Sequence, residues 1–186
     1  MVHLEKAVRL APNYLDALLL LGIEYVKSGR YDMAEPILEK ARVLAPKDIN
    51  IRINLGVVYF RLGENSAANE TAEKYYRRAA HVLEEALRLD PKVAITSFYL
   101  GTVLYKAGRY RAAEALLLNA LVLDGQMHDA RLALLNVYLR QQRYMEASKQ
   151  ISYLARSNVS AEQRRQIERV AIEIESALAR GEERKP

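Results

Sequence analysis

The chain has 186 residues, of which 51% are hydrophobic and 27% charged, and its formal net charge is +5. This composition is ordinary for a globular chain, and because cysteine is absent it excludes a disulfide framework and a cysteine-based zinc site. No apolar run approaches the roughly 20 residues that a membrane-spanning helix needs, and basic and acidic residues are interleaved, so we expect neither membrane insertion nor nucleic-acid binding.

The first predicted element is a helix over residues 1–10. Leu4, Ala7 and Pro12 recur with the same residue types 34 positions later. Residues 1–12 therefore have the pattern of the second half of a repeat, which predicts that the chain was cut from a longer protein. Val8 and Leu10 would then lack part of their usual neighbours, and an uncapped repeat end of this kind predicts a homodimer through the N-terminal end.

Two helices are predicted next, over residues 13–28 and 31–44. Gly22 lies inside the first of them, where a glycine costs about 1 kcal/mol relative to alanine. It therefore predicts a close approach of the neighbouring helix. Gly29 follows the end of the same helix and predicts a left-handed C-cap. The landmarks of this unit are Leu21-Gly22, Tyr25, Gly29, Tyr31, Ala34, Ala41 and Pro46.

The following unit keeps the 34-residue spacing as far as Gly63, which again predicts a C-cap. Pro46 and Pro91 are then 45 residues apart, an excess of 11 that lies between Gly63 and Tyr76. Helices are predicted over residues 47–62 and 66–89. Eleven residues make about three α-helical turns, so the insertion keeps helical phase and predicts a second helix longer by about 16 Å. A mobile loop is the alternative.

The third unit is regular, with helices predicted over residues 92–107 and 110–123 and a C-cap at Gly108. The fourth, with helices at 127–141 and 144–157, is degenerate. It has Leu135 where the mid-helix glycine is expected and Val159 where the proline is expected.

A last helix is predicted over residues 160–181. Ile167, Val170, Ile174 and Leu178 lie on one stripe of it, with arginine and glutamate opposite. A helix with one apolar face caps the end of a repeat stack, where the final unit has a single neighbour.

These columns resemble the tetratricopeptide repeat (TPR) family, whose 34-residue helix–turn–helix carries Leu-Gly and Tyr, then two Ala and a closing Pro. The resemblance covers about residues 1 to 158 and implies an all-α, right-handed α-solenoid with a C-terminal capping helix. The predicted units are a half repeat (1–12), four repeats (13–46, 47–91, 92–125 and 126–159), the capping helix (160–181) and a tail (182–186).

The resemblance also implies that the first helix of each repeat lines a concave groove that binds other molecules. Carried onto this sequence, the groove contains Leu19, Ile53, Phe98 and Leu132; Ile23, Val57, Thr102 and Asn136; Phe60 and Tyr105; and a basic column of Lys27, Arg61, Lys106 and Arg140. Exposed apolar surface of this extent favours a binding site. The alternative is that neighbouring helices bury part of these columns.

We therefore predict a scaffold that binds a peptide or helix of a partner protein with apolar and acidic groups. Two specialised TPR sites are not expected. The carboxylate clamp of chaperone-binding TPRs would keep only Asn54, and an asparagine ladder is broken by Leu20, Tyr99 and Ala133. The alternatives are a structural or self-associating module, a regulatory arm of a larger enzyme or assembly, and RNA binding, which the even charge distribution disfavours.

The sequence gives no sign of catalysis. His3, His81 and His128 have no partners at metal-ligand spacing, and no glycine-rich phosphate loop is present. We expect no enzymatic activity, no cofactor and no metal. The expected location is the cytoplasm, or the periplasm or exterior if the chain is part of a longer exported protein.

Overall fold

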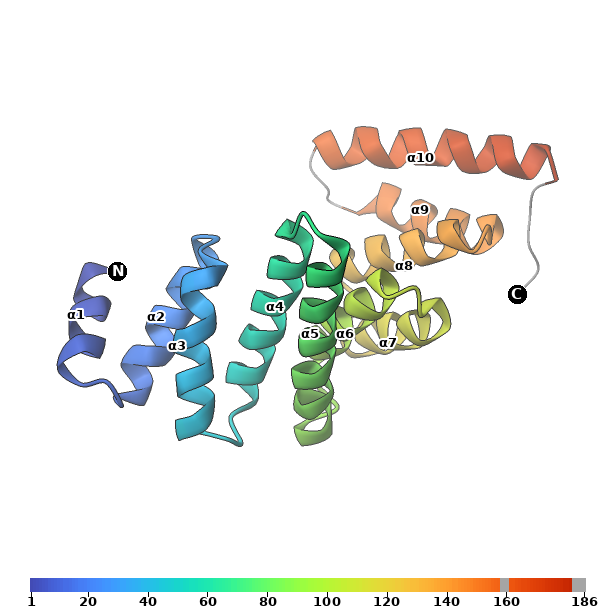
Figure 1. Cartoon of the computed structure of the whole chain (residues 1–186). Helices are drawn as coiled ribbons and strands as arrows, with labels where there is room; N and C mark the ends of the chain where they lie inside the picture. Colours follow the sequence, from blue (N-terminus) through green and yellow to red (C-terminus); the bar gives the residue numbers. More distant parts are fainter. Residues whose placement is uncertain (158–160, 182–186) are drawn as a thin grey trace.

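The computed structural model describes residues 1–157 and 161–181, apart from the side chains of Gln163 and Gln166. Within these ranges every regular element is an α-helix, and successive helices form antiparallel hairpins (Figure 1). The helices are α1 (Val2–Leu10), α2 (Leu15–Lys27), α3 (Tyr31–Leu44), α4 (Ile49–Asn65), α5 (Asn69–Leu89), α6 (Ala94–Lys106), α7 (Tyr110–Leu123), α8 (His128–Arg140), α9 (Tyr144–Arg156) and α10 (Ala161–Ala179).

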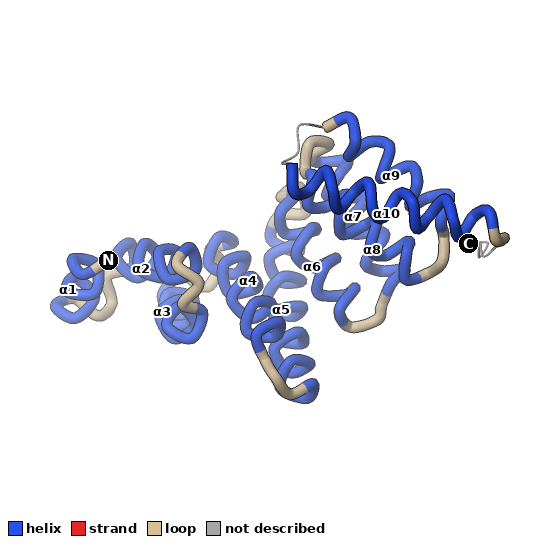
Figure 2. Tube along the Cα trace, turned by 90° about the horizontal axis from the view of Figure 1, so that it is seen from above, coloured by secondary structure: helices blue, strands red, loops and turns tan. Residues whose placement is uncertain are grey.

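The hairpins stack into an elongated, winding row (Figure 2). Each helix packs against the helices before and after it, and α2, α4, α6 and α8 also contact one another in sequence. Across the described residues no such contact joins α3, α5, α7 and α9 to one another. The first helix of each hairpin therefore lies on the inner, concave side of a right-handed α-solenoid, as predicted.

The mid-helix glycines allow the two helices of a hairpin to approach closely. A Cβ atom on Gly56 would lie 2.5 Å from Cγ of Leu83, which is fully buried. Gly22 faces Leu38 at the same distance. Nothing larger than hydrogen fits there, which explains why glycine is tolerated inside these helices.

The prolines that close each unit lie in short turns, and the next helix begins three residues after each one. Helix α4 begins at Ile49, later than the predicted residue 47, because Asp48 acts as its N-cap. The Asp48 carboxylate accepts hydrogen bonds from the backbone nitrogens of Asn50 and Ile51, at 2.8 and 3.3 Å. The carboxylate thus pairs two amide groups that the first helical turn leaves without partners.

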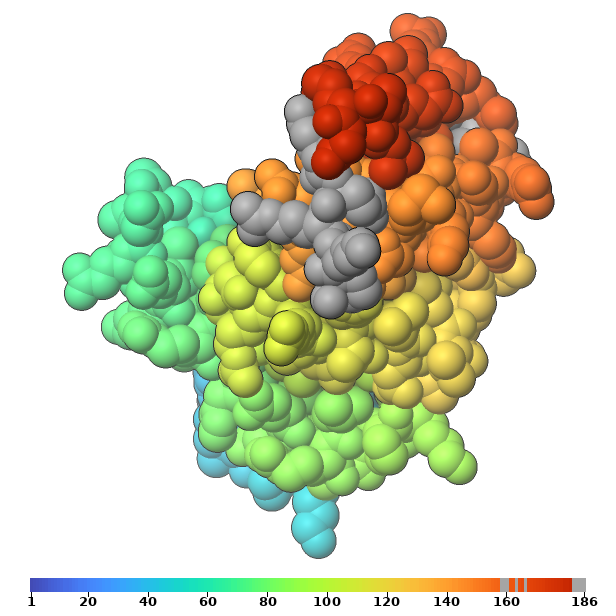
Figure 3. All heavy atoms as spheres, turned by 90° about the vertical axis from the view of Figure 1, so that its right-hand side faces the viewer, coloured from blue at the N-terminus to red at the C-terminus, as the bar shows by residue number. Residues whose placement is uncertain are grey.

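The inserted residues lengthen both helices of one hairpin. Helix α4 has 17 residues and α5 has 21, whereas the equivalent α6 and α7 have 13 and 14. The prediction that α5 alone absorbs the insertion and gains about 16 Å was wrong: its seven extra residues add about 10 Å. Because both helices extend, they support each other, and their tip stands out from the flank of α6 and α7 (Figure 3).

Gly63 differs from the C-cap that the sequence predicts. Gly29 and Gly108 have a φ of +72° at the ends of α2 and α6, as expected. Gly63 is instead buried inside α4, where a Cβ atom would lie 2.7 Å from Cε1 of Tyr76. The C-cap prediction at Gly63 was wrong because α4 continues for two residues beyond it and packs against the lengthened α5.

Helix α10 lies across α9 at the end of the stack (Figure 1). Ile167 and Ile174 of the predicted stripe are buried, and Val170 and Leu178 are half-buried against the core. This is the packing expected of a capping helix. The predicted tail at 182–186 and the junction at 158–160 lie outside the described residues.

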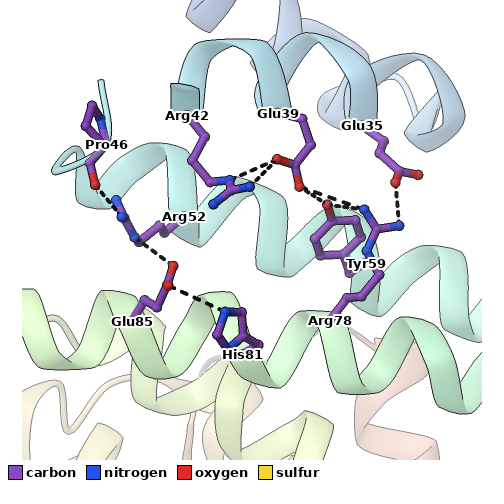
Figure 4. A network of polar contacts seen from close by, with 9 residues as sticks. All are labelled: Glu35, Glu39, Arg42, Pro46, Arg52, Tyr59, Arg78, His81 and Glu85. Atoms are coloured by element: carbon purple, nitrogen blue, oxygen red, sulfur yellow. Dashed lines mark hydrogen bonds and ion pairs between the residues drawn. The ribbon is translucent and has the colours of Figure 1, made fainter. Parts of the chain in front are cut away.

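A polar network joins α3, α4 and α5 (Figure 4). The Tyr59 hydroxyl donates to the Glu39 carboxylate and accepts a hydrogen bond from Arg78 at 2.7 Å. Arg78 also forms an ion pair with Glu35 at 2.6 Å, and its guanidinium lies 4.0 Å from the centre of the Tyr59 ring. A side chain of α5 therefore reaches across α4 and ties the lengthened hairpin to the preceding one.

These contacts shift the pKa values of Tyr59 and Glu39 in opposite directions. Burial and the bond to Glu39 raise the pKa of Tyr59. Burial also acts to raise the pKa of Glu39, but the hydrogen bonds from Tyr59 and Arg42 outweigh it and the pKa of Glu39 is lowered. At neutral pH the network thus holds a neutral phenol beside an ionised carboxylate.

Candidate functional site

A hollow of about 320 Å³ opens on the inner side of the solenoid, between α4, α6 and α8. We call it the groove hollow. Six of the predicted groove residues line it: Phe60, Arg61, Phe98, Thr102, Leu132 and Asn136. The remaining lining residues are Glu64, Tyr99, Asp129 and Ala133.

Aromatic rings form much of this hollow. The rings of Phe98 and Tyr99 have centroids 4.9 Å apart, and those of Phe60 and Tyr99 are 6.4 Å apart, both tilted. These spacings are typical of favourable aromatic pairs. Phe60 is only 4% exposed and forms part of the floor, whereas Phe98 and Leu132 remain partly accessible.

The predicted basic column is largely paired with acidic groups. Glu64 accepts from Arg61 at 2.7 Å and from Lys106 at 3.1 Å, and Lys27 pairs with Glu24 at 3.3 Å. Glu64 occupies a helical position only because α4 is extended. The groove hollow therefore carries mixed charge, with Asp129 as a further carboxylate in its lining.

The other predicted groove residues lie on the inner helices α2, α4, α6 and α8 without lining the hollow. Lys27, Lys106 and Arg140 are exposed, and Arg140 donates to the Tyr105 hydroxyl at 3.4 Å. Tyr105 also packs against Tyr110, with ring centroids 5.8 Å apart. Half-buried positions are held by Leu19, Ile23, Ile53, Val57 and Tyr105.

Sequence reasoning did not select Tyr99, Ala133 and Glu64 for this site. Tyr99 and Ala133 come directly after the predicted groove residues Phe98 and Leu132. They were considered only as positions of the carboxylate clamp or the asparagine ladder. An aromatic residue beside a predicted groove position was the available signal. For Glu64 there was none, since the predicted α4 ended before it.

The described part of the chain contains neither a cluster of metal ligands nor a helix that could span a membrane. No group of three histidine, aspartate or glutamate side chains there is placed to hold a metal ion. Among the described helices, none is both long enough and apolar enough to cross a bilayer.

Comparison with known families finds one described as tetratricopeptide repeat, whose model matches residues 19–77, 71–128 and 99–157. These overlapping matches span most of the chain and include the inner helices α4, α6 and α8 in full and most of α2. No curated protein matches the sequence.

Several solved structures have the same fold. A thermophilic TPR protein of Thermus thermophilus, TTC0263, is 26% identical with a TM-score of 0.73, covering 95% of this chain and 87% of that one. MamA 41-end from Desulfovibrio magneticus RS-1 is 21% identical with a TM-score of 0.71, covering 84% of both chains. The Yersinia enterocolitica type III secretion translocator chaperone SycD is 22% identical with a TM-score of 0.58, covering 69% of this chain and 94% of that one.

Proposed function

Because this chain belongs to the tetratricopeptide repeat family, we propose that it is an interaction scaffold that binds a segment of a partner protein at the groove hollow. The observation that supports the proposal most directly is the hollow itself. Three inner helices converge there around Phe98 and Leu132, which are apolar and partly accessible. A surface of this kind suits the apolar side chains of an extended or helical peptide.

The preferred partner segment is apolar with scattered polar groups. Asn136 is exposed at the rim of the hollow and offers an amide to a peptide backbone. The sequence predicts a preference for acidic partner groups from four basic side chains, but two of them, Arg61 and Lys106, already pair with Glu64. It is proposed here for the end of the groove where Arg140 is exposed.

The proposal is tested by selecting short random peptides on the wild-type chain and measuring their affinity by fluorescence anisotropy. Phe98→Asp and Leu132→Asp each place a carboxylate in the apolar hollow. We expect either substitution to weaken the selected peptides by about tenfold or more, since removing a central apolar anchor costs about 2 kcal/mol.

Val122→Asp provides the matched control, because Val122 is 83% exposed on α7, a second helix. It should leave both the helical circular dichroism and peptide affinity unchanged. If the selected peptides bind the two groove variants as well as they bind wild type, the groove hollow is not the binding site.

Self-association through α1 stays an alternative prediction. Helix α1 contains no buried residue, and its Val2 and Leu10 are 71% and 77% exposed. Light scattering over a range of concentrations separates a dimer from a monomer. A mass that stays monomeric at high micromolar concentration would remove this alternative.

A further inference from the structure

A second concavity lies outside the inner groove, beneath the tip of the lengthened α4–α5 hairpin. We call it the insertion notch. It has a volume of about 550 Å³, within the range of ligand-binding pockets. Its walls are the first half of α5 and the C-terminal end of α6 with the turn that follows. The lining residues are Asn69, Ala72, Glu73, Tyr76, Arg77, Ala80, Val103, Leu104, Lys106, Ala107 and Arg109.

The insertion creates one wall of this notch. Asn69, Ala72 and Glu73 belong to the 11 extra residues and have no counterpart in the other hairpins. Tyr76 forms the base of that wall. Its ring packs against α4 at Gly63, where no side chain occupies the space, and its centroid is 6.0 Å from that of the Phe60 ring. The base of the wall is therefore a packed part of the fold.

The notch combines an apolar floor with a basic rim. Alanine side chains from both helices, with Val103 and Leu104, supply the apolar part. Arg77, Lys106 and Arg109 are the cations of the lining, and Glu73 is its only carboxylate. Lys106 is already paired with Glu64, but within the described part of the chain neither Arg77 nor Arg109 has an ion-pair partner.

From this arrangement we infer that the insertion notch binds an acidic segment of a partner protein, with one apolar side chain on the floor and flanking carboxylates on Arg77 and Arg109. Two exposed guanidinium groups, one on each wall, match carboxylates by charge and by their fork of donors. The small alanine side chains leave room for a leucine or phenylalanine between them. This site is separate from the groove hollow and gives the scaffold a second point of attachment.

The test uses two short fluorescein-labelled peptides. The acidic peptide has a leucine flanked by aspartate and glutamate, and in the basic peptide lysine and arginine replace these acidic residues. We expect the acidic peptide to shift the NMR signals of the Ala72, Ala80 and Ala107 methyl groups, and the basic peptide to leave them unchanged. Arg77→Glu with Arg109→Glu should weaken the acidic peptide by about tenfold or more, measured by anisotropy.

Two control variants separate the notch from general charge and from the groove. Arg9→Glu with Arg88→Glu makes the same change in net charge at exposed positions outside the notch, and Phe98→Asp disrupts the groove hollow. Both should retain binding of the acidic peptide at the notch. The inference is overturned if the three alanine signals do not move, if the basic peptide moves them equally, or if both charge variants lose the same affinity. Loss in Phe98→Asp alone would assign the peptide to the groove instead.

Discussion

The lengthened hairpin α4–α5 and the regular hairpin α6–α7 use the same sequence column in different ways. In the regular hairpin, Gly108 follows the end of α6 with a φ of +72°, and apart from its neighbours in the chain no residue has an atom within 4 Å of where its Cβ would be. In the lengthened hairpin, Gly63 lies inside α4, and the ring of Tyr76 occupies the space that a side chain would need. One glycine supplies backbone freedom and the other supplies room.

The difference shows how a repeat protein acquires a local feature without losing its stack. The insertion has a nearly whole number of helical turns, so Tyr76 stays on the face toward α4. The part of the hairpin outside the insertion therefore packs like the neighbouring hairpins. Within the insertion, α4 and α5 extend side by side. The result is a wall for the insertion notch, which the regular hairpins do not have.

The largest expected effect comes from Gly63→Ala, which breaks the close packing in the lengthened hairpin. The new Cβ would lie 2.7 Å from the Tyr76 ring, so the ring must move and the free energy of unfolding should fall by about 2 kcal/mol. In a Tyr76→Ala background the same change should instead stabilise by about 1 kcal/mol, because alanine is the better helix former. Urea denaturation of the four proteins measures both effects.

The equivalent experiment on the regular hairpin is the control. Gly108→Ala should cost about 1 kcal/mol because alanine is disfavoured at positive φ. This cost should be the same with Tyr110 or with Tyr110→Ala, since Tyr110 does not fill the space at Gly108. If the effect of Gly63→Ala on the free energy of unfolding is also the same with Tyr76 and with Tyr76→Ala, then Gly63 does not make room for the ring and the proposed difference between the two glycines is wrong.

The sequence predicted the fold well because its columns record packing that every repeat shares. The 34-residue period and the mid-helix glycines correctly predicted the helical hairpins, and the apolar stripe correctly predicted the capping helix α10. The period could not show how the insertion is divided between α4 and α5, because that depends on contacts made only after both helices extend. For the same reason the pairing of Glu64 with Arg61 and Lys106, and with it the mixed charge of the groove hollow, was beyond sequence reasoning.

The two hairpins also differ in how each joins the helix before it. The lengthened hairpin has Tyr59, bonded to Glu39 and Arg78, whereas the regular hairpin has Leu104 in that column. Tyr59→Phe removes the hydroxyl and leaves a half-buried carboxylate with one donor fewer. We expect the free energy of unfolding at pH 7 to fall by about 1 to 2 kcal/mol.

Acid should reduce this penalty. The pKa of Glu39 is lowered in the folded state, so its contribution is present at neutral pH and is lost as the pH falls through that lowered value. Once the pH is below that lowered pKa, the carboxyl is protonated and accepts a weaker bond, so wild type and Tyr59→Phe should approach each other in stability. A penalty that stays constant as the pH is lowered from 7 through the acid range would show that the bond from Arg78 to the hydroxyl, and not the bond from the hydroxyl to the Glu39 carboxylate, accounts for the loss.

The smallest expected effect concerns the fourth hairpin, where the same column holds Gln142 with a φ of 57°. It is the one non-glycine residue with positive φ in the described part of the chain. An L-residue pays about 1 kcal/mol for this conformation, and glycine avoids most of that cost. Gln142→Gly should therefore stabilise the chain by somewhat less than about 1 kcal/mol in urea denaturation, and Gly108→Gln should destabilise it by a similar amount. If Gln142→Gly proves destabilising, contacts of the glutamine side chain outweigh its backbone strain, and the turn of the fourth hairpin differs in kind from the turn at Gly108.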